Sequence, residues 1–443
     1  ILIFNMVFYH VNSQSVTISH DQESLLLQNN KISRTFHLPA QNPSFYTTSF
    51  SPLAGDFNYW DDSPHPEFSF TLDGQQLNGL DHWQLQKIEN AADNYKGQGA
   101  TVFLKDSQNR IELAITYLLY PDLPVVRKKI AFKNLTEQPQ KLEDVDIERF
   151  RLANYVPLTY SWVISDYGRR RHLGPYKGNM FDVVTLLHNM DSRQGILVGN
   201  EAPGVLKRTT MFWDAPEITT GLSHSDDRFP FRRWLAPRQT WETPPVFTMV
   251  YNDYADPDQL LNQELNQYVN FHLGTRLSQL SEKPTFVYNT WEPFNKNIDE
   301  KLVMELAKAA AEAGMKEFVI DDGWTDNYGD WTIDKKKFPN GFKPVFDYIK
   351  SLGMKPGLWM SVGSASIDSK VFQEHPEYFV RDQLGNFASL HAKGVKDKMT
   401  ACFATGWYDH IKSILLKMIN EYGLEYLKLD FAVVTSPYML EHE

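Results

Sequence analysis

The sequence predicts a multidomain chain in which a large all-β domain is followed by an α/β domain. Segments of alternating apolar and polar residues recur before about residue 255, where helical periodicity is rare. After Pro284, helices alternate with buried strands, and a glycine follows each helix. The length of 443 residues suits about two to four domains.

The all-β domain is predicted over residues 16–255, as a β-sandwich of two packed sheets. Residues 111–119 place apolar side chains at every odd position, which is the period of a half-buried strand. Similar segments lie at 125–132, 145–150 and 246–251, with Pro, Gly, Asn and Asp clusters between them. Residues 256–283 have a helical pattern at their start and are expected to link the two domains.

The second domain, residues 284–443, is built from repeated helix and strand units. Residues 300–313 predict a helix that begins at Asn297 or Asp299 and stops at Gly314. Its expected apolar stripe consists of Leu302, Val303, Leu306, Ala309, Ala310 and Ala313. Further helices at 343–352 and 407–422 end at Gly353 and Gly423, and each glycine precedes a buried strand.

Polar and aromatic residues stand at the carboxyl ends of these apolar strands: Trp291, Asp321, Asp322, Trp359 and Asp430. A βα barrel and a doubly wound sheet both place ligands at that edge. The sequence has no glycine-rich loop of the form G-x-G-x-x-G, which favours the barrel.

Lys428 and Asp430 are two residues apart on one predicted strand, so their side chains share a face. A neighbouring ammonium is expected to lower the pKa of Asp430 and keep it ionised, as a nucleophile requires. A structural ion pair at a strand end is the alternative, and composition alone does not decide between them.

Asp321 and Asp322 crowd two acids where a strand ends, and Gly323 allows a turn there. Both carboxylates can face the barrel mouth only if the strand stops at Asp321, since strict alternation would bury one of them. They could accept hydrogen bonds from sugar hydroxyls, act as acid and base, or bind a cation. The metal interpretation is disfavoured, because Asp326 and Asp330 have no histidine near them.

Trp291, Trp331 and Trp359 are expected to offer flat apolar faces to a pyranose ring, in a chain that is 14% aromatic. The net charge of −11 makes nucleic acid and anionic membranes poor partners. The single cysteine, Cys402, excludes a disulfide framework and a cysteine-based metal site within the chain. No cofactor is expected.

Residues 1–15 predict the remnant of a signal peptide and therefore export to the periplasm or the extracellular space. The first nine residues are mostly apolar and a small polar run follows, although Asn5 and His10 also fit a native strand. The chain stops at Glu443 without completing a helix or strand pattern, so we expect a fragment at both ends.

Five motifs together resemble glycoside hydrolase family 36, the retaining α-galactosidases and their relatives. In chain order they are NTWE at 289–292, FVIDDGW at 318–324, GDW at 329–331, GLW at 357–359 and YLKLD at 426–430. The resemblance is close over about residues 284–435. It implies a β-sandwich followed by a (β/α)8 TIM barrel, of which about the first four βα units are present, and it implies self-association through the β domain.

The resemblance also implies site roles. Asp430 corresponds to the nucleophile, Lys428 to a sugar-hydroxyl ligand, and Asp321 and Asp322 to the pair that holds the galactose O4 and O6 hydroxyls. Trp291 and Trp359 correspond to walls of the −1 subsite, with Trp331 beside them. The acid/base residue of the family lies on a later strand and is not expected in this chain.

Three motif positions depart from the family pattern. Met360-Ser361-Val362 stands where Glu-Pro-Glu is common, no clear arginine precedes the nucleophile strand, and Phe431-Ala432 replaces Met-Asn. The resemblance implies an α-galactosidase acting on α-galactoside oligosaccharides or polysaccharide side chains. An α-N-acetylgalactosaminidase or α-galactosyltransferase on the same fold, a non-catalytic sugar-binding protein and a metal-dependent hydrolase are the alternatives.

Overall fold

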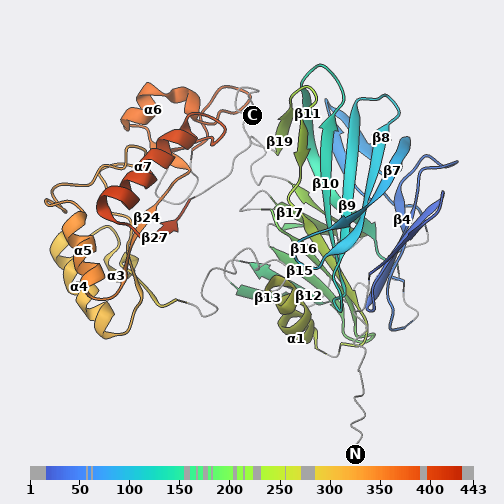
Figure 1. The fold of residues 1–443 in the computed structure, drawn as a ribbon, viewed down its shortest axis with the longest axis horizontal. Helices are drawn as coiled ribbons and strands as arrows, with labels where there is room; N and C mark the ends of the chain where they lie inside the picture. The colour runs from blue at the N-terminus through green and yellow to red at the C-terminus, as the bar shows by residue number, and fades with distance from the viewer. Residues whose placement is uncertain are drawn as a thin grey trace, which may run out of the picture. The chain divides into compact units, whose positions relative to one another are not determined.

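The structure, a computed structural model, describes most of the chain from residue 16 to residue 431. The described ranges are 16–55, 58–60, 63–153, 160–165, 168–172, 178–180, 183–202, 207–212, 215–222, 231–254, 256–270, 285–389 and 397–431. The expected leader, residues 1–15, lies outside them. Contacts divide the chain into two compact units (Figure 1). The first unit holds most of the described residues up to residue 270, and the second holds the described residues from 285 onward.

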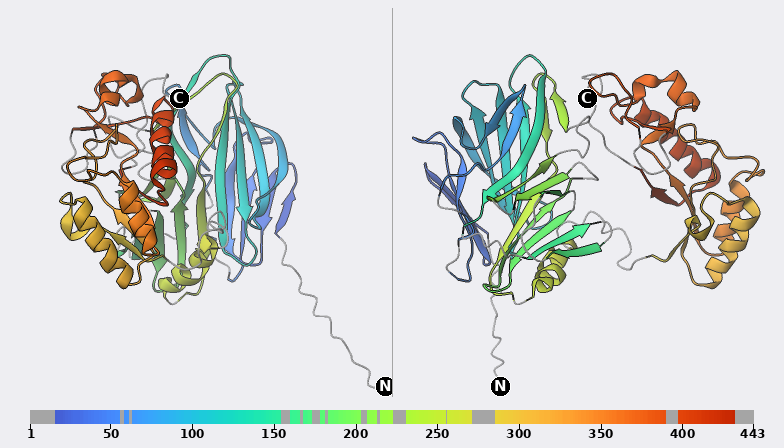
Figure 2. Two further views of the ribbon diagram at one scale, coloured as in Figure 1. Left: turned by 60° about the vertical axis from the view of Figure 1, so that its left-hand side comes forward. Right: turned by 180° about the vertical axis from the view of Figure 1, so that it is seen from behind.

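The first unit consists mainly of antiparallel strands, as the alternating patterns predict (Figure 2). A four-stranded sheet contains β1 (Thr17–His20), β2 (Ser24–Gln28), β3 (Ile32–His37) and β4 (Tyr46–Pro52). A ten-stranded sheet runs in the order β13 (Gly168–His172), β12 (Tyr160–Ser165), β15 (Val184–Asn189), β16 (Gln194–Asn200), β21 (Val246–Tyr251), β10 (Val125–Asn134), β9 (Ile111–Leu119), β8 (Gln98–Asp106) and β7 (Trp83–Ala92), with β20 (Thr240–Glu242) beside β10. A seven-stranded sheet has the order β14 (Gly178–Met180), β17 (Lys207–Phe212), β18 (Ala215–Leu222), β11 (Gln140–Arg151), β5 (Ser69–Leu72) and β6 (Gln75–Asn78), with β19 (Arg232–Leu235) beside β11.

The strand at 111–119 has the predicted bounds and burial: Ile111, Leu113, Ile115 and Tyr117 are fully buried and alternate with half-buried residues. It pairs with β10 in antiparallel register, with Ile115 opposite Ile130. The segment at 246–251 also has its predicted bounds, whereas β10 and β11 extend beyond the apolar runs that predicted them.

A buried ionic network lies in the core of the first unit and joins side chains from all three of its large sheets. Arg34 on β3 is 0% exposed and donates to Glu67 at 2.7 Å and to Glu148 on β11 at 2.8 Å. Lys128 on β10 donates to Glu67 at 2.9 Å and lies 3.3 Å from Glu148. Tyr117 on β9 adds a 2.7 Å hydrogen bond to Glu67. Two cations therefore balance two carboxylates, and the side chains of all four residues are buried.

The network determines the protonation of its members. Burial alone would lower the pKa of Arg34, but the attraction of Glu148 and Glu67 outweighs burial and raises it. Burial alone would raise the pKa of Glu67, but Arg34 and Lys128 outweigh it and lower the pKa. The charges of these groups are thus retained within the core.

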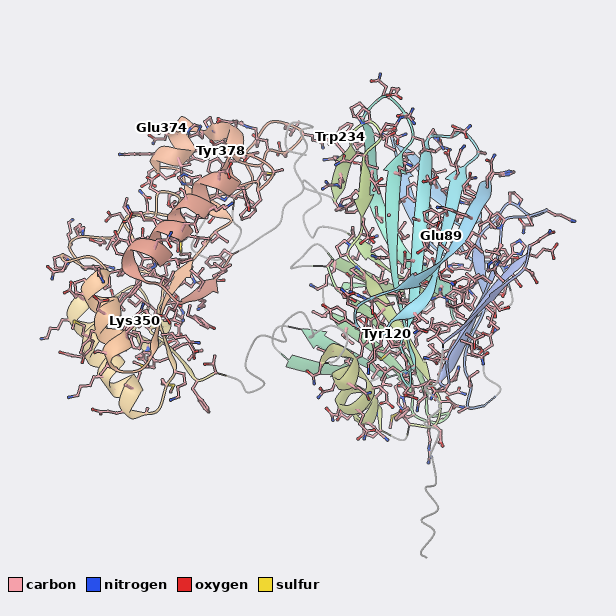
Figure 3. All side chains as sticks on the ribbon, in the orientation of Figure 1. Glu89, Tyr120, Trp234, Lys350, Glu374 and Tyr378 are labelled. Carbon is pink, nitrogen blue, oxygen red and sulfur yellow. The ribbon has the colours of Figure 1, made fainter. Side chains whose placement is uncertain are left out.

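The described part of the predicted linker is helical and packs on the ten-stranded sheet. It consists of α1 (Pro257–Leu260), a π-helical turn (Leu261–Leu265) and α2 (Asn266–Tyr268). Leu260, Leu261 and Tyr268 are buried in one cluster with Phe247 and Tyr120, the last of which is labelled in Figure 3. The remainder of the predicted linker lies outside the described residues.

The second unit is built on a parallel sheet of four strands in chain order: β22 (Val287–Asn289), β23 (Glu317–Ile320), β24 (Lys355–Met360) and β27 (Tyr426–Leu429). The connections between them carry α4 (Glu300–Glu312), α5 (Lys343–Ser351) and α7 (Trp407–Tyr422) in turn. Shorter elements are α3 (Trp291–Phe294), β25 (Ser364–Ser366), α6 (Lys370–Glu374), a 3-10 turn (Pro376–Tyr378) and β26 (Lys398–Thr400). The carboxyl ends of the four strands consequently meet at one edge.

The glycine stops behave as predicted. Gly314, Gly353 and Gly423 have φ angles of +84°, +81° and +76°. After Gly423, the backbone N–H of Leu424 donates to the carbonyl of Met418 at 3.2 Å, the reversed bond that closes a helix and redirects the chain into a strand.

The predicted stripe of the helix at 300–313 is partly wrong. The buried residues of α4 are Val303, Ala307 and Ala310, while Ala309 is exposed and Ala313 follows the helix. Positions 303, 307 and 310 lie on one helical face, and the predicted stripe was centred on the adjacent row. Asp299, one of the two expected caps, accepts the N–H of Leu302 at 2.8 Å.

Candidate active site

The strand that precedes the two adjacent acids ends where both can reach the sheet edge. β23 stops at Ile320, so Asp321 and Asp322 lie beyond the alternating part of the strand. Gly323 has a φ of +119°, and a Cβ atom there would lie 2.7 Å from the Cα of Lys296. The turn therefore requires glycine both for its conformation and for the close approach of the 290s segment.

Asp321 is buried and receives donors from both neighbouring sides of the sheet. Its Oδ2 accepts from Asn289 Nδ2 at 2.6 Å and from Lys428 Nζ at 2.7 Å. Its Oδ1 accepts the backbone N–H of Asp322 at 2.8 Å. Thr290 Oγ1 accepts the N–H of Asp321 at 2.9 Å. The carboxylate is thus held by β22 and β27 together.

Asp430 follows β27 and is half-buried. Its Oδ2 accepts from the indole Nε1 of Trp359 at 2.9 Å, and its Oδ1 accepts the N–H of Phe431 at 2.9 Å. The expected direct pairing of Lys428 with Asp430 is not found among the described residues. Lys428 instead reaches across the sheet edge to Asp321.

Asp322 is 6% exposed and is held by residues that follow the first two parallel strands. Its Oδ2 accepts from Tyr328 Oη at 2.5 Å and from Lys296 Nζ at 2.9 Å. Burial raises the pKa of Tyr328, and the hydrogen bond to Asp322 together with the charges of Asp322, Asp430 and Asp321 raises it further. Tyr328 therefore remains a protonated donor and lies within the field of all three carboxylates.

Three aromatic rings form a compact cluster beneath these acids. Tyr328 stacks on Trp331 with ring centres 5.1 Å apart and meets Trp359 at 5.4 Å. Trp331 also stacks on Trp324 and is only 2% exposed. Trp359 is equally buried, at 2% exposed, so neighbouring side chains cover both rings in this structure. The expectation that Trp331 and Trp359 offer flat faces to a sugar therefore stays a prediction, and Trp331 packs against Tyr328 and Trp359 within the core.

Trp291 occupies a different position from the other predicted aromatic residues. It begins α3 just after β22, its side chain is half-buried, and its backbone N–H donates to Asn289 Oδ1 at 2.8 Å. That bond orients the same Asn289 whose amide donates to Asp321. Trp291 is thereby tied to the acid cluster through its backbone.

The charges at this edge follow a simple pattern. Lys428 neutralises Asp321 and Lys296 neutralises Asp322, whereas the described partners of Asp430 are an indole and a backbone N–H. Of the three carboxylates, Asp430 is the one without a cation among the described residues. A hydrogen-bonded carboxylate of this kind suits nucleophilic attack or stabilisation of a developing positive charge.

No group of three or more His, Cys, Asp or Glu residues in the described ranges has a geometry that could hold a metal ion. The acids at the sheet edge are instead occupied by lysine, asparagine and tyrosine donors. Carboxylates held in place by fixed donors can accept hydrogen bonds from hydroxyl groups, so the arrangement suits a ligand that is rich in hydroxyl groups.

Comparison with known proteins shows what this chain resembles in sequence and in fold. Residues 240–439 match the family model described as Melibiase. The α-galactosidase Mel36A of Lactobacillus acidophilus is 24% identical over 391 residues, which cover 80% of this chain and 50% of that protein. A solved GH36 α-galactosidase, a variant of AgaA from Geobacillus stearothermophilus in complex with raffinose, superposes with a TM-score of 0.67 at 14% identity. The chain is thus similar in sequence and fold to the α-galactosidases of glycoside hydrolase family 36.

The fold likeness to family 36 extends over most of the chain. The AgaA variant covers 92% of this chain, which in turn covers 65% of that structure. The α-galactosidase of Lactobacillus brevis covers 93% of this chain with a TM-score of 0.72 and 18% identity, and the match spans 64% of that structure. The chain spans about half the length of the curated relatives it matches.

Three residues were not predicted as site residues but contact the acids directly: Asn289, Lys296 and Tyr328. Asn289 lies inside the NTWE motif, two residues before Trp291, so its place at a strand end was an available signal. Lys296 and Tyr328 lie in segments without strand or helix periodicity, and nothing in their spacing indicates that they meet at Asp322.

Proposed function

We propose that this protein is a retaining α-galactosidase that hydrolyses terminal α-galactosyl residues by double displacement, with Asp430 as the nucleophile. The observation that carries the proposal is the isolation of Asp430, an ionisable carboxylate without a described cationic partner, beside two lysine-paired aspartates. Asp321, Asp322 and Lys428 serve as ligands of the sugar hydroxyls, and Trp359 and Trp291 as walls of the sugar site.

The proposed reaction has two steps with balanced bonds. In the first, an Asp430 carboxylate oxygen forms a bond to the anomeric carbon while the glycosidic bond breaks, and a carboxylic acid protonates the departing oxygen. In the second, water deprotonated by the same residue attacks the anomeric carbon and releases Asp430. The hydrogen bond from Trp359 holds one Asp430 oxygen and so fixes the orientation of the carboxylate for attack.

We propose that the acid/base residue comes from outside the described part of the chain. A retaining enzyme needs two carboxyl groups about 5–5.5 Å apart. Asp321 and Asp322 each pair with a lysine and are proposed here as ligands of the sugar hydroxyls, so neither is assigned this role. We also propose that the four parallel strands are the first part of a (β/α)8 barrel, supported by their sequential order and by the helix in each connection.

We propose α-galactoside oligosaccharides of the raffinose type, or galactosyl side chains of polysaccharides, as substrates. Support comes from the raffinose bound by the AgaA variant, a structural neighbour of this chain. The paired aspartates provide acceptors for the hydroxyls that distinguish galactose. Room at the sugar C2 substituent separates this function from an α-N-acetylgalactosaminidase, and the acceptor of the intermediate separates it from an α-galactosyltransferase.

The test uses the full-length gene product and three aryl substrates: an α-galactoside, an α-N-acetylgalactosaminide and an α-glucoside. We expect turnover of the galactoside, and proton NMR of the first product should show α-galactose before mutarotation. First release of the β anomer would contradict the retaining mechanism. Turnover of the N-acetylgalactosaminide alone would favour that second activity, and binding of galactose without any turnover would favour a sugar-binding protein.

Trp359→Phe is expected to lower kcat/KM for the aryl α-galactoside by roughly 10- to 100-fold, the size of one hydrogen bond to a charged group. The substitution removes the 2.9 Å indole donor of Asp430 and keeps an aromatic ring in the cluster. Steady-state kinetics measures the effect.

Trp407→Phe is the matched control for Trp359→Phe. Trp407 is also buried in the second unit, and its indole donates at 2.9 Å to a backbone carbonyl, that of Val362. The Trp407→Phe substitution should lower the unfolding temperature but leave kcat/KM for the aryl α-galactoside unchanged. Equal kinetic losses in the two variants would show that Asp430 gains nothing from Trp359.

We propose that the protein is exported, on the strength of the short apolar run at residues 1–9 and the polar run after it. Among the described residues, no helix is both long and apolar enough to cross a membrane. Cell fractionation of the native host, followed by N-terminal sequencing of the mature protein, tests the proposal. Recovery of unprocessed protein in the cytoplasm would contradict it.

A further inference from the structure

One oxygen of Asp322 carries both of the side-chain donors that reach this carboxylate. Tyr328 Oη lies 2.5 Å and Lys296 Nζ 2.9 Å from Oδ2. Oδ1 accepts no hydrogen bond from the described residues, and it is not among the buried polar atoms that lack a partner. The Asp322 side chain is 8% exposed. One oxygen is therefore anchored and the other is left to accept from a ligand.

Backbone contacts fix the position of Lys296. Its Cα and carbonyl oxygen lie where a Cβ at residue 323 would collide at 2.7 Å, so only glycine allows the approach. Lys337 Nζ donates to the carbonyl of Lys296 at 2.8 Å and to the carbonyl of Gly323 at 2.7 Å. These contacts join the segment after β22 to the turn after β23, and they place the Lys296 ammonium at Asp322.

Contacts with Ser366, Trp331 and two lysines fix the position of Tyr328. Its backbone N–H donates to Ser366 Oγ at 3.2 Å, and its carbonyl accepts the N–H of Ser366 at 3.0 Å. Its ring is 3% exposed and stacks on Trp331. The ammonium groups of Lys296 and Lys398 lie 5.6 Å and 4.9 Å from the ring centre. The ring is thus fixed by packing and by two cations, so its hydroxyl can point only toward a limited region.

A role in overall stability does not explain the Lys296 contact well. The Lys296 side chain is 56% exposed, and pairs with an exposed partner contribute little to folding. We propose that Lys296 and Tyr328 are positioning residues that fix Asp322 so that its free oxygen accepts one particular sugar hydroxyl, and that they thereby set the selectivity of the site for that hydroxyl. The inference rests on the proposed function, which supplies the galactose hydroxyls at C4 and C6 as the candidates.

The test couples each substitution to the removal of a single substrate hydroxyl. In the full-length gene product, Tyr328→Phe and Lys296→Met should each lower kcat/KM for an aryl α-galactoside about tenfold. Substrates that lack the 4-hydroxyl or the 6-hydroxyl are then compared. With the one whose missing hydroxyl Asp322 accepts, the loss should shrink below about twofold, because nothing remains to be positioned. With the other substrate, the tenfold loss should persist.

Matched controls separate positioning from general damage. Tyr408→Phe removes a tyrosine hydroxyl from a side chain that is 50% exposed on α7, and Lys301→Met removes a cation whose side chain is 86% exposed on α4. Both should leave kcat/KM unchanged for all three substrates. Lys296→Arg should recover most of the activity lost in Lys296→Met, because it retains the charge and the donors.

Calorimetric binding of D-galactose and its 4-deoxy and 6-deoxy analogues repeats the comparison without turnover. If the wild type binds galactose but hydrolyses nothing, the proposed function fails while the affinities still test the positioning role. Losses of equal size on galactose and both deoxy sugars, or no loss in either variant, would overturn the inference. So would a wild type that does not bind galactose.

Discussion

Replacement of Asp430 by alanine is expected to lower kcat for an aryl α-galactoside by about 10⁴-fold or more, which is typical of the loss of a covalent nucleophile. The structure gives the physical reason: Asp321 and Asp322 are occupied by lysines, and neither can substitute for Asp430. Stopped-flow and steady-state assays measure the loss. The unfolding temperature should change little, since Asp430 is only half-buried.

Azide distinguishes a nucleophile from an acid/base residue in the alanine variant. If Asp430 is the nucleophile, azide attacks the anomeric carbon of an activated aryl α-galactoside directly and gives β-galactosyl azide, with the phenolate as leaving group. An acid/base residue would leave the galactosyl-enzyme to be trapped as the α-azide. Asp409→Ala, at an exposed carboxylate on α7, is the control and should retain full activity. Full activity of Asp430→Ala would refute the mechanism.

Arg34→Met should lower the free energy of unfolding of the first unit by about 3–5 kcal/mol, the usual consequence of removing one partner from a buried ion pair. Glu67 and Glu148 would then share Lys128 as their remaining buried cation among the described residues, and one negative charge would lie uncompensated in the core. Denaturant unfolding, followed through the signal of the β-rich unit, measures the change.

The control for Arg34 is an arginine in a solvent-exposed pair. Arg238 is 59% exposed and pairs with Glu137, which is 73% exposed. Arg238→Met should cost less than about 1 kcal/mol. If Arg34→Met and Arg238→Met were equally mild, the buried network would have no special role in the stability of the first unit.

The strands and helices with strong periodicity were predictable from sequence. Residues 111–119, 246–251 and 407–422 have the predicted bounds. The first has a period of two, the second is a short apolar run, and the third is a helical pattern between Gly406 and Gly423, and each leaves few alternatives. The stripe of α4 was misjudged by one row, since alanines lie on several faces and do not mark the buried one. The network around Arg34 could not be predicted, because its members are more than 100 residues apart at the extremes.

The candidate site was predictable where chemistry coincides with a strand end. Asp321, Asp322, Lys428 and Asp430 meet at one edge, as parallel strands require. The partner of Lys428 was not predictable. The alternation along the strand suggests Asp430, whereas the Lys428 side chain reaches past β24 to Asp321, which follows β23. The contacts of Tyr328 and Lys296 with Asp322 were not predicted, because loop residues follow no periodic sequence pattern that shows which of them lie close together in the fold.

Gly323 limits how mutation can alter the carboxyl edge of the parallel sheet. The Lys296 backbone occupies the space that a side chain at position 323 would need, and Lys337 donates to the carbonyls of both Lys296 and Gly323. The segment around Lys296 and the turn at Gly323 are therefore structurally coupled. An insertion or deletion in one segment would displace side chains on the other, with Lys296 on one and Asp322 on the other. Engineers who wish to change the sugar preference should therefore exchange positions 296, 323 and 337 together, as a cassette, rather than search them one at a time.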